Sequence, residues 1–199
     1  MPVNDQLKCI FIHIPKTGGS SINTVLRGHG GLSLFGDVPK GERRNGQPGH
    51  YHHFRWHEVK NHVDPEVWRN YFKFAVVRNP WDRVVSWFEY HKVTKSNTER
   101  KMTFDQWVRK RPGPQMYRHT HDKAGMLLTL KLDAVLRYEN YAEDLSVLWE
   151  RLNVRVDKMP HIKKTERRPY QEYYNDEQRQ LIADHYVHDI ELFGYTFDG

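Results

Sequence analysis

Cysteine is almost absent from this chain of 199 residues, because Cys9 is the only one. A single cysteine excludes an intrachain disulfide and a zinc site built from several thiolates. Cys9 lies in an apolar stretch, where a small buried hydrophobic residue is a better interpretation than a nucleophile.

Long hydrophobic runs are also missing from the sequence. No stretch reaches the roughly 20 apolar residues that a membrane-spanning helix needs. Residues 1–6 lack the charged and then apolar pattern of a signal peptide. We therefore expect a soluble cytoplasmic protein with no membrane partner.

Acidic residues are outnumbered, since 31 Lys and Arg stand against 25 Asp and Glu and give a formal net charge of +6. This balance favours a negatively charged ligand. The two signs are interleaved rather than separated into a tail, so a nucleotide fits the composition as well as a nucleic acid does. A hydrophobic content of 38% in a chain of this length predicts one folded domain over residues 1–199.

Short apolar runs predict three β-strands, each followed by a helix. The strands are expected at residues 9–14, 71–78 and 133–139, and the helices after them begin near Ser20, Pro80 and Tyr141. This alternation is typical of an α/β fold, a three-layer P-loop-like domain with a central parallel sheet flanked by helices. Further helices are expected after Asp64, from Thr103 to about Arg109, and from Asn175 to about Leu192.

Two segments are predicted as functional loops. Residues 28–50 are rich in Gly and Pro, and a connection of this length is unusual inside a compact domain, so we expect a flexible or substrate-binding loop. The basic segment 158–170 is the second expected loop.

The first expected strand runs into Pro15-Lys16-Thr17-Gly18-Gly19-Ser20-Ser21. Proline ends the strand, the glycines allow a tight turn, and Ser20 or Ser21 is expected to cap the next helix. The N-terminus of a helix attracts an anion. Because Lys16 precedes the glycines, whereas the lysine of ATPase and GTPase P-loops follows them, the Walker pattern is excluded.

A second anion motif follows the second expected strand. Arg78 ends that strand, and Ser86 lies two turns into the next helix, so both can face one anion. Ligands of parallel sheets bind at the carboxyl ends of the strands, and both motifs fall there.

These motifs resemble those of sulfotransferases that use 3′-phosphoadenosine 5′-phosphosulfate (PAPS). Residues 15–21 resemble the 5′-phosphosulfate loop, and Arg78, Pro80, Arg83 and Ser86 match the outline of the 3′-phosphate motif, Arg-x-Pro-x-x-Arg-x-x-Ser. Residues 136–140, 168–174 and 189–195 extend the resemblance over most of the chain. The chain is similar to bacterial proteins related to carbohydrate O-sulfotransferases.

The resemblance implies a role for each motif. Lys16 is expected to bind the phosphosulfate and stabilise charge on the bridging oxygen, and Thr17, Gly18, Gly19, Ser20 and Ser21 to hold the 5′-phosphate. Arg78 and Ser86 are expected to hold the 3′-phosphate, and the late segment to close over the nucleotide. That segment contains Lys163, Lys164, Arg167, Arg168 and Tyr170. Sulfuryl transfer, like phosphoryl transfer, depends on positioning and charge stabilisation, and no metal is expected because lysine and arginine supply the charge.

The acceptor, a hydroxyl of a carbohydrate or small molecule, needs a base. Five histidines lie between His50 and His62, and the resemblance favours His53, with His52 and His57 as alternatives. His119 and His121 lack a third metal ligand at a recognisable spacing, so a loop is the better interpretation.

Two other functions remain as alternatives. One is a small-molecule kinase with a variant phosphate loop, which the position of Lys16 disfavours. The other is a basic nucleic-acid-binding module, which leaves both strand-end motifs unexplained.

Overall fold

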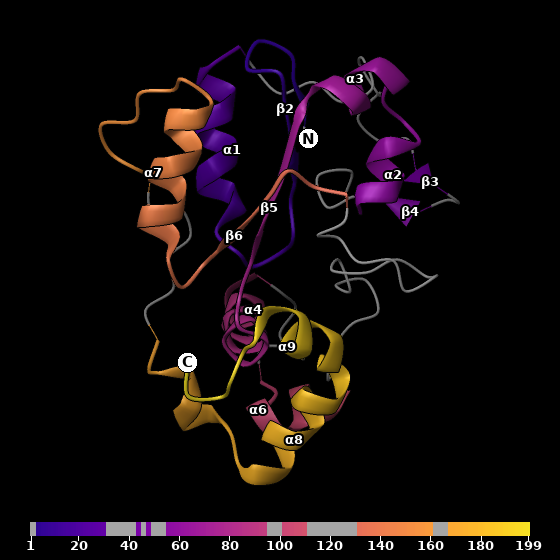
Figure 1. Ribbon diagram of the computed structural model, residues 1–199. Helices are drawn as coiled ribbons and strands as arrows, with labels where there is room; N and C mark the ends of the chain where they lie inside the picture. The colour runs from indigo at the N-terminus through magenta and orange to yellow at the C-terminus, as the bar shows by residue number, and fades with distance from the viewer. Residues whose placement is uncertain are drawn as a thin grey trace. The chain divides into compact units, whose positions relative to one another are not determined.

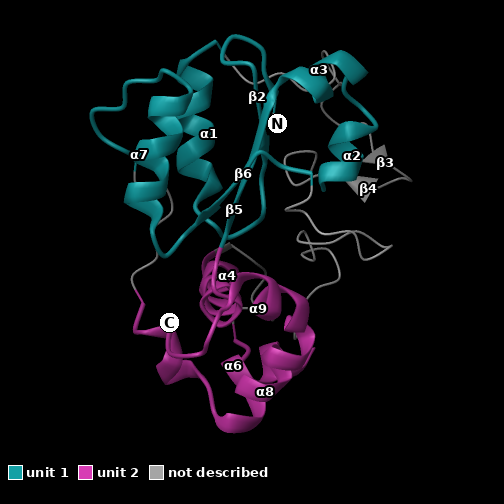
Figure 2. Cartoon of the chain, in the orientation of Figure 1, with its two compact units in different colours: residues 1–77, 121–162 teal, residues 78–120, 163–199 magenta. Residues whose placement is uncertain are grey.

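The structure, a computed structural model, describes residues 3–30, 43–44, 47–48, 55–94, 101–110, 131–160 and 167–199. The chain divides into two compact units, shown in different colours in Figure 2. Unit 1 comprises Met1–Val77 and His121–Ile162, and unit 2 comprises Arg78–Thr120 and Lys163–Gly199. The single domain expected from chain length stays a prediction.

Unit 1 is built on a four-stranded sheet with the order β1-β2-β5-β6 (Figure 1). The strands are β1 (Val3–Asn4), β2 (Cys9–Ile12), β5 (Phe72–Val77) and β6 (Ala134–Arg137). β2, β5 and β6 run parallel, with Phe11 opposite Phe74 and Val76 opposite Leu136, and β1 pairs antiparallel with β2. The three expected strands and the α/β class are therefore confirmed.

One face of this sheet packs against α1 (Gly19–Gly28) and α7 (Tyr141–Arg151), which lie side by side in Figure 1. Alternate residues of the strands point to this face, so Cys9 and Phe11 join a core with helix residues such as Leu26 and Leu145. Burial raises the pKa of the Cys9 thiol to about 12, so the thiol is protonated near neutral pH. Cys9 is thus the buried hydrophobic residue that its position predicts.

The other side of the sheet carries α2 (Trp56–Lys60) and α3 (Pro65–Asn70), on the far side of the sheet from α1 and α7 in Figure 1. The rings of Trp56 and Trp68 have centroids 6.3 Å apart, and the Lys73 ammonium on β5 lies 5.9 Å from the Trp68 ring. Asp64 begins α3, accepting a hydrogen bond of 2.7 Å from the Glu66 N–H. Helices therefore flank the sheet on both sides within unit 1.

Unit 2 is helical and has an aromatic core. Its elements are α4 (Pro80–Thr94), α6 (Phe104–Lys110), a 3₁₀ turn η4 (Tyr170–Tyr173), α8 (Asp176–His185) and α9 (Val187–Phe193). Ring centroids lie 4.8 Å apart for Trp87 and Trp107 and 5.2 Å apart for Phe88 and Phe104. The single last helix expected from the sequence was wrong, because the chain breaks at Tyr186 into α8 and α9.

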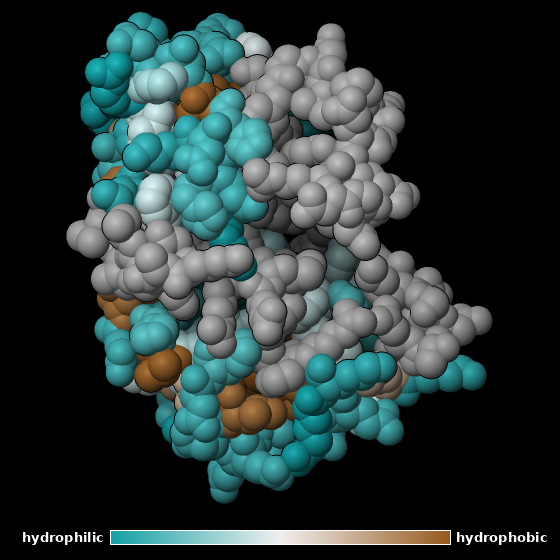
Figure 3. Space-filling model, turned by 90° about the vertical axis from the view of Figure 1, so that its right-hand side faces the viewer, coloured by the Kyte–Doolittle hydropathy of each residue, from teal (hydrophilic) through white to brown (hydrophobic). Residues whose placement is uncertain are grey.

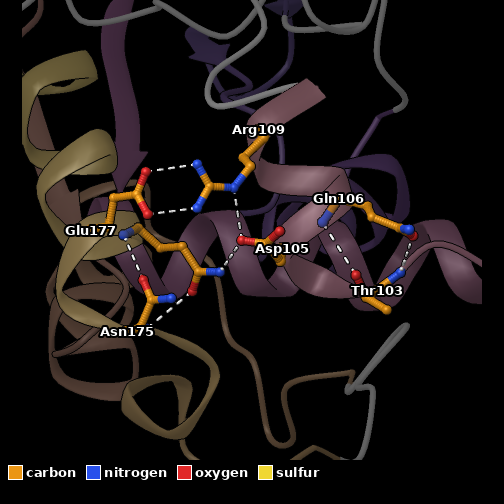
Figure 4. Close-up of polar contacts among 7 residues, drawn as sticks. Thr103, Asp105, Gln106, Arg109, Asn175 and Glu177 are labelled. Atoms are coloured by element: carbon orange, nitrogen blue, oxygen red, sulfur yellow. Dashed lines mark hydrogen bonds and ion pairs between the residues drawn. The ribbon is translucent and has the colours of Figure 1, made fainter.

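A polar network joins α6 to α8 (Figure 4). The Arg109 guanidinium donates two hydrogen bonds of 2.7 Å to the Glu177 carboxylate and a third of 2.9 Å to Asp105. Gln178 donates to the same Asp105 oxygen at 2.8 Å. The expected cap of α8 is confirmed, since Asn175 accepts from the Gln178 N–H and the Gln178 side chain accepts from the Asn175 N–H.

The described surface has little clustered apolar area. On the face in Figure 3, hydrophobic residues form small patches among hydrophilic ones. The large hydrophobic side chains that are exposed in the described part come from three different helices, and they are Val93, Val147 and Val187. Within the described residues, no helix combines the length and the apolar character needed to cross a bilayer.

Candidate functional site

The parallel strands place their carboxyl ends at one edge of the unit 1 sheet. The first motif follows β2 at this edge, and Arg78 is the residue directly after β5. Both motifs thus follow a strand at the edge where parallel sheets bind ligands.

The loop between β2 and α1 contains two residues with left-handed backbone, Lys16 with φ 68° and Gly18 with φ 81°. Such a conformation suits glycine and is uncommon for lysine, which points to a loop whose shape is imposed by its surroundings. Thr17 is fully buried, and its hydroxyl donates a hydrogen bond of 2.8 Å to the Ile14 carbonyl. The Lys16 side chain is partly exposed.

The expected serine cap of α1 was wrong. Gly18 is the N-cap, with no side-chain hydrogen bond, and the helix begins at Gly19. The left-handed turn at Gly18 brings the chain into the helix before either serine, so Ser20 and Ser21 lie in its first turn. That turn contains no acidic residue, so the positive end of the helix dipole is not offset by a local carboxylate.

His13 supports this loop from the strand side. His13 is 8% exposed. Its imidazole stacks on Phe11 with centroids 5.3 Å apart, and its Nδ1 atom lies 3.2 Å from the Asn23 amide nitrogen. A Cβ atom on Gly19 would lie 2.3 Å from the His13 ring. Position 19 is therefore a glycine because the ring and the helix backbone approach closely.

Tyr141 supports the same loop from α7. Its hydroxyl donates a hydrogen bond of 2.8 Å to the Gly18 carbonyl and is also hydrogen-bonded to the Ser21 side chain. Burial raises the pKa of Tyr141, followed by the effect of Tyr138, so the phenol is a neutral donor at physiological pH. The sequence pattern predicts only a helix start at Tyr141.

In unit 2, Arg78 belongs to a cluster with Asp82 and Arg167. The Arg78 Nε and Nη2 atoms each lie 2.7 Å from Oδ2 of Asp82, and Arg167 donates from Nη2 to Oδ1 of the same carboxylate. The Arg78 side chain is 5% exposed. Asp82 lies in the first turn of α4, where a negative charge also favours the helix dipole.

The other members of the second motif take different environments. Ser86 lies on α4, one turn beyond Asp82, and is partly exposed. Arg83 is buried, with a guanidinium nitrogen 4.0 Å from the Asp189 carboxylate and its guanidinium 5.9 Å from the Tyr186 ring centroid. Arg83 is thus part of the interior of unit 2.

The late segment is described from Arg167 onward. The Arg168 guanidinium lies 4.4 Å from the centroid of the Tyr173 ring, and Arg168 is exposed. The Tyr170 hydroxyl donates to the Phe197 carbonyl at 2.6 Å and accepts from the Asn79 amide at 3.3 Å. Tyr170 therefore ties the chain's last residues to the start of α4.

The expected site residues His52, His53 and Lys164 lie outside the described residues. So do His119 and His121, for which a loop without a metal is expected. His57 is described, lies on α2 and is partly exposed, with its ring edge-on to Trp56 at 5.7 Å. Within the described ranges, no three His, Cys, Asp or Glu side chains gather closely enough to hold a metal ion.

Comparison with known proteins identifies one family. The sequence model of the sulfotransferase family matches residues 1–196, which include both anion motifs. Searches of curated proteins and of solved structures found no match.

Proposed function

The chain belongs to the sulfotransferase family, and we propose that it transfers a sulfuryl group from PAPS to a hydroxyl of a carbohydrate or another small acceptor. The observation that carries this proposal is the loop of residues 13–18, where a lysine stands ahead of a helix N-terminus that holds no acidic residue. Family membership supports sulfuryl transfer in general, and the choice of donor and acceptor is the proposal.

The 5′-phosphosulfate is assigned to the loop in unit 1. The first N–H groups of α1, at Gly19, Ser20 and Ser21, would bind the 5′-phosphate because a helix N-terminus offers donors and positive potential to an anion. Thr17 and Gly18 would contribute backbone groups, since the Thr17 hydroxyl is directed to the Ile14 carbonyl. The supports from His13 and Tyr141 would keep these donors in place before the ligand arrives.

Lys16 is the residue proposed to stabilise the leaving group. As the acceptor oxygen forms its bond to sulfur, the bond between sulfur and the bridging oxygen breaks, and adenosine 3′,5′-bisphosphate (PAP) leaves. The Lys16 ammonium would neutralise the charge that develops on the bridging oxygen. His53, with His52 and His57 as alternatives, would accept the proton of the acceptor hydroxyl.

The 3′-phosphate is assigned to Arg78 and Ser86 of unit 2. An arginine donates in a fork that suits a phosphate, and a serine hydroxyl adds one further donor. Lys164, Arg168 and Tyr170 of the late segment are the remaining proposed nucleotide contacts. No metal is needed in this scheme because the basic side chains supply the charge.

The test of this proposal is the release of PAP from PAPS with a panel of sugar and phenol acceptors. Lys16→Ala should lower kcat about 100-fold or more, as the loss of a transition-state donor does elsewhere. Lys60→Ala is the matched control, because Lys60 is an exposed lysine of the same unit. Full activity in Lys16→Ala would contradict the catalytic assignment.

Binding experiments separate the alternatives. Calorimetry should detect PAP and find ATP with Mg²⁺ much weaker, whereas a kinase would show the reverse order. Weak PAP binding together with tight, strongly salt-dependent binding of duplex DNA would favour the nucleic-acid module. His53→Ala should lose turnover and still bind PAP, and unchanged turnover would eliminate His53 as the base.

A further inference from the structure

Asp82 joins two arginines that come from distant parts of unit 2. Arg78 precedes α4, whereas Arg167 is 85 residues beyond Asp82 in the sequence and precedes η4. The two oxygens of one carboxylate are shared between them, Oδ2 with Arg78 and Oδ1 with Arg167. The cluster therefore consists of two guanidinium groups bridged by one carboxylate.

This arrangement fixes the direction of both guanidinium groups. Arg78 contacts Asp82 through Nε and Nη2, the two nitrogens of one edge, so the plane of its guanidinium is set. The side chains of Arg78, Asp82 and Arg167 are 5%, 14% and 18% exposed. Two guanidinium groups this close would repel one another in such a weakly solvated place without the carboxylate.

Anchoring of the late segment does not require Asp82. The Tyr174 hydroxyl donates to the Trp81 carbonyl at 2.9 Å, and Asn79 donates to Tyr170 at 3.3 Å. These two contacts already tie residues 170–174 to the start of α4. The late segment is therefore joined to the start of α4 by contacts that do not involve Asp82.

We propose that Asp82 is a positioning residue for the 3′-phosphate of the donor, because it holds Arg78 and Arg167 as a pair of fork donors for a single phosphate group. This inference rests on the proposed function, which assigns the 3′-phosphate to Arg78. A phosphate monoester presents three strong acceptor oxygens, more than one guanidinium fork can satisfy. Asp82 lets a second arginine stand beside the first and so adds N–H donors, while the three side chains together keep a net charge of +1.

The test compares two nucleotides that differ only in the 3′-phosphate. PAP and adenosine 5′-phosphate are titrated into the full-length protein, and the ratio of their affinities measures recognition of the 3′-phosphate. Wild-type protein should prefer PAP. Asp82→Asn should lower PAP affinity about 10-fold or more, the usual effect of losing a charge-assisted contact, and leave adenosine 5′-phosphate affinity within about twofold.

Matched variants separate positioning from general damage. Asp105→Asn removes a different carboxylate–arginine contact of the same unit and should keep the affinity ratio. Asp82→Glu keeps the charge and should recover a large part of the PAP preference. Arg167→Gln should reduce the same ratio, and it provides the decisive measurement if Asp82→Asn does not fold.

The outcomes distinguish the two levels of the proposal. If wild-type protein binds PAP and adenosine 5′-phosphate with equal affinity, or binds neither nucleotide, the proposed 3′-phosphate site is wrong. The proposed role of Asp82 is then wrong as well. If wild-type protein prefers PAP and both Asp82→Asn and Arg167→Gln keep that preference, the role of Asp82 alone is overturned. A stronger preference in Asp82→Asn would mean that the carboxylate competes with the phosphate, which also overturns the inference.

Discussion

Gly19→Ala tests how tightly the loop between β2 and α1 is packed. A Cβ atom at position 19 would meet Cδ2 and Nε2 of His13 at 2.3 Å and Cγ at 3.0 Å. Carbon atoms in contact prefer a separation of about 3.5–4.0 Å, so the ring would have to move by about 1 Å. The ring is held by stacking on Phe11 and by Asn23, so the movement disturbs β2 and α1 together.

The expected cost follows from these contacts. Overpacking of a buried site costs about 1–3 kcal/mol, and alanine returns up to about 1 kcal/mol through its helix propensity. We expect a net loss of about 1–2 kcal/mol, or a fall of about 4 °C in Tm for a chain of this size. PAP binding should weaken as well, because Gly19 begins the helix that is proposed to hold the 5′-phosphate.

Gly28→Ala is the matched control, since it makes the same change at the other end of α1. A Cβ atom there would meet nothing within 4 Å, so we expect a gain of about 0.5 kcal/mol. Thermal unfolding of both variants, followed by circular dichroism, should give shifts of opposite sign. Equal Tm values would refute the reasoning, and so would a Gly19→Ala loss that persists unchanged in a His13→Ala background.

Two further outcomes are expected. Tyr141→Phe removes the hydroxyl bonded to Gly18 and Ser21 and should cost about 1–2 kcal/mol in urea denaturation with weaker PAP binding; an unchanged midpoint would show that this hydroxyl does not stabilise the loop. Hydrogen bonds from Gln178 and then Arg109 lower the pKa of Asp105. Because the pKa is lower in the folded state than in the unfolded state, the ionised Asp105 carboxylate stabilises the fold above the unfolded-state pKa, and this contribution is lost as the pH falls toward the folded-state pKa. Tm should therefore fall as the pH drops below about 4, and the fall should be shallower in Asp105→Asn.

The main elements of the fold were predictable because their signals are local. The strands at Cys9–Ile12, Phe72–Val77 and Ala134–Arg137 are apolar runs ended by turn residues, and each lies inside its predicted range. Three strands of two residues each, β1, β3 (Arg43–Arg44) and β4 (Gln47–Pro48), are too short for any periodic pattern. The break at Tyr186 had no local signal, because the sequence pattern continues across it. The Tyr186 ring is buried, and the Arg83 guanidinium lies 5.9 Å from its centroid.

The candidate residues that the sequence offered are those close to a strand end. Arg78 follows β5 directly and Lys16 lies four residues beyond the end of β2, and proximity to a strand end is visible in the sequence. Tyr141 and Arg167 reach their partners across 123 and 85 residues, and no local pattern encodes such a contact. Asp82 lies four residues after Arg78, a local spacing that the sequence shows, but its contact with Arg167 had no sign in the sequence.

The neighbours Asp82 and Arg83 show why a motif identifies residues better than it identifies their roles. Successive residues of a helix point about 100° apart, so two adjacent positions of α4 serve different surroundings. The Asp82 side chain contacts Arg78 and Arg167, whereas the Arg83 side chain faces Asp189 and Tyr186 inside unit 2. The second arginine of the motif therefore stabilises the helical unit, and the aspartate between the motif's defined positions is the residue that arranges the charges proposed to meet the 3′-phosphate.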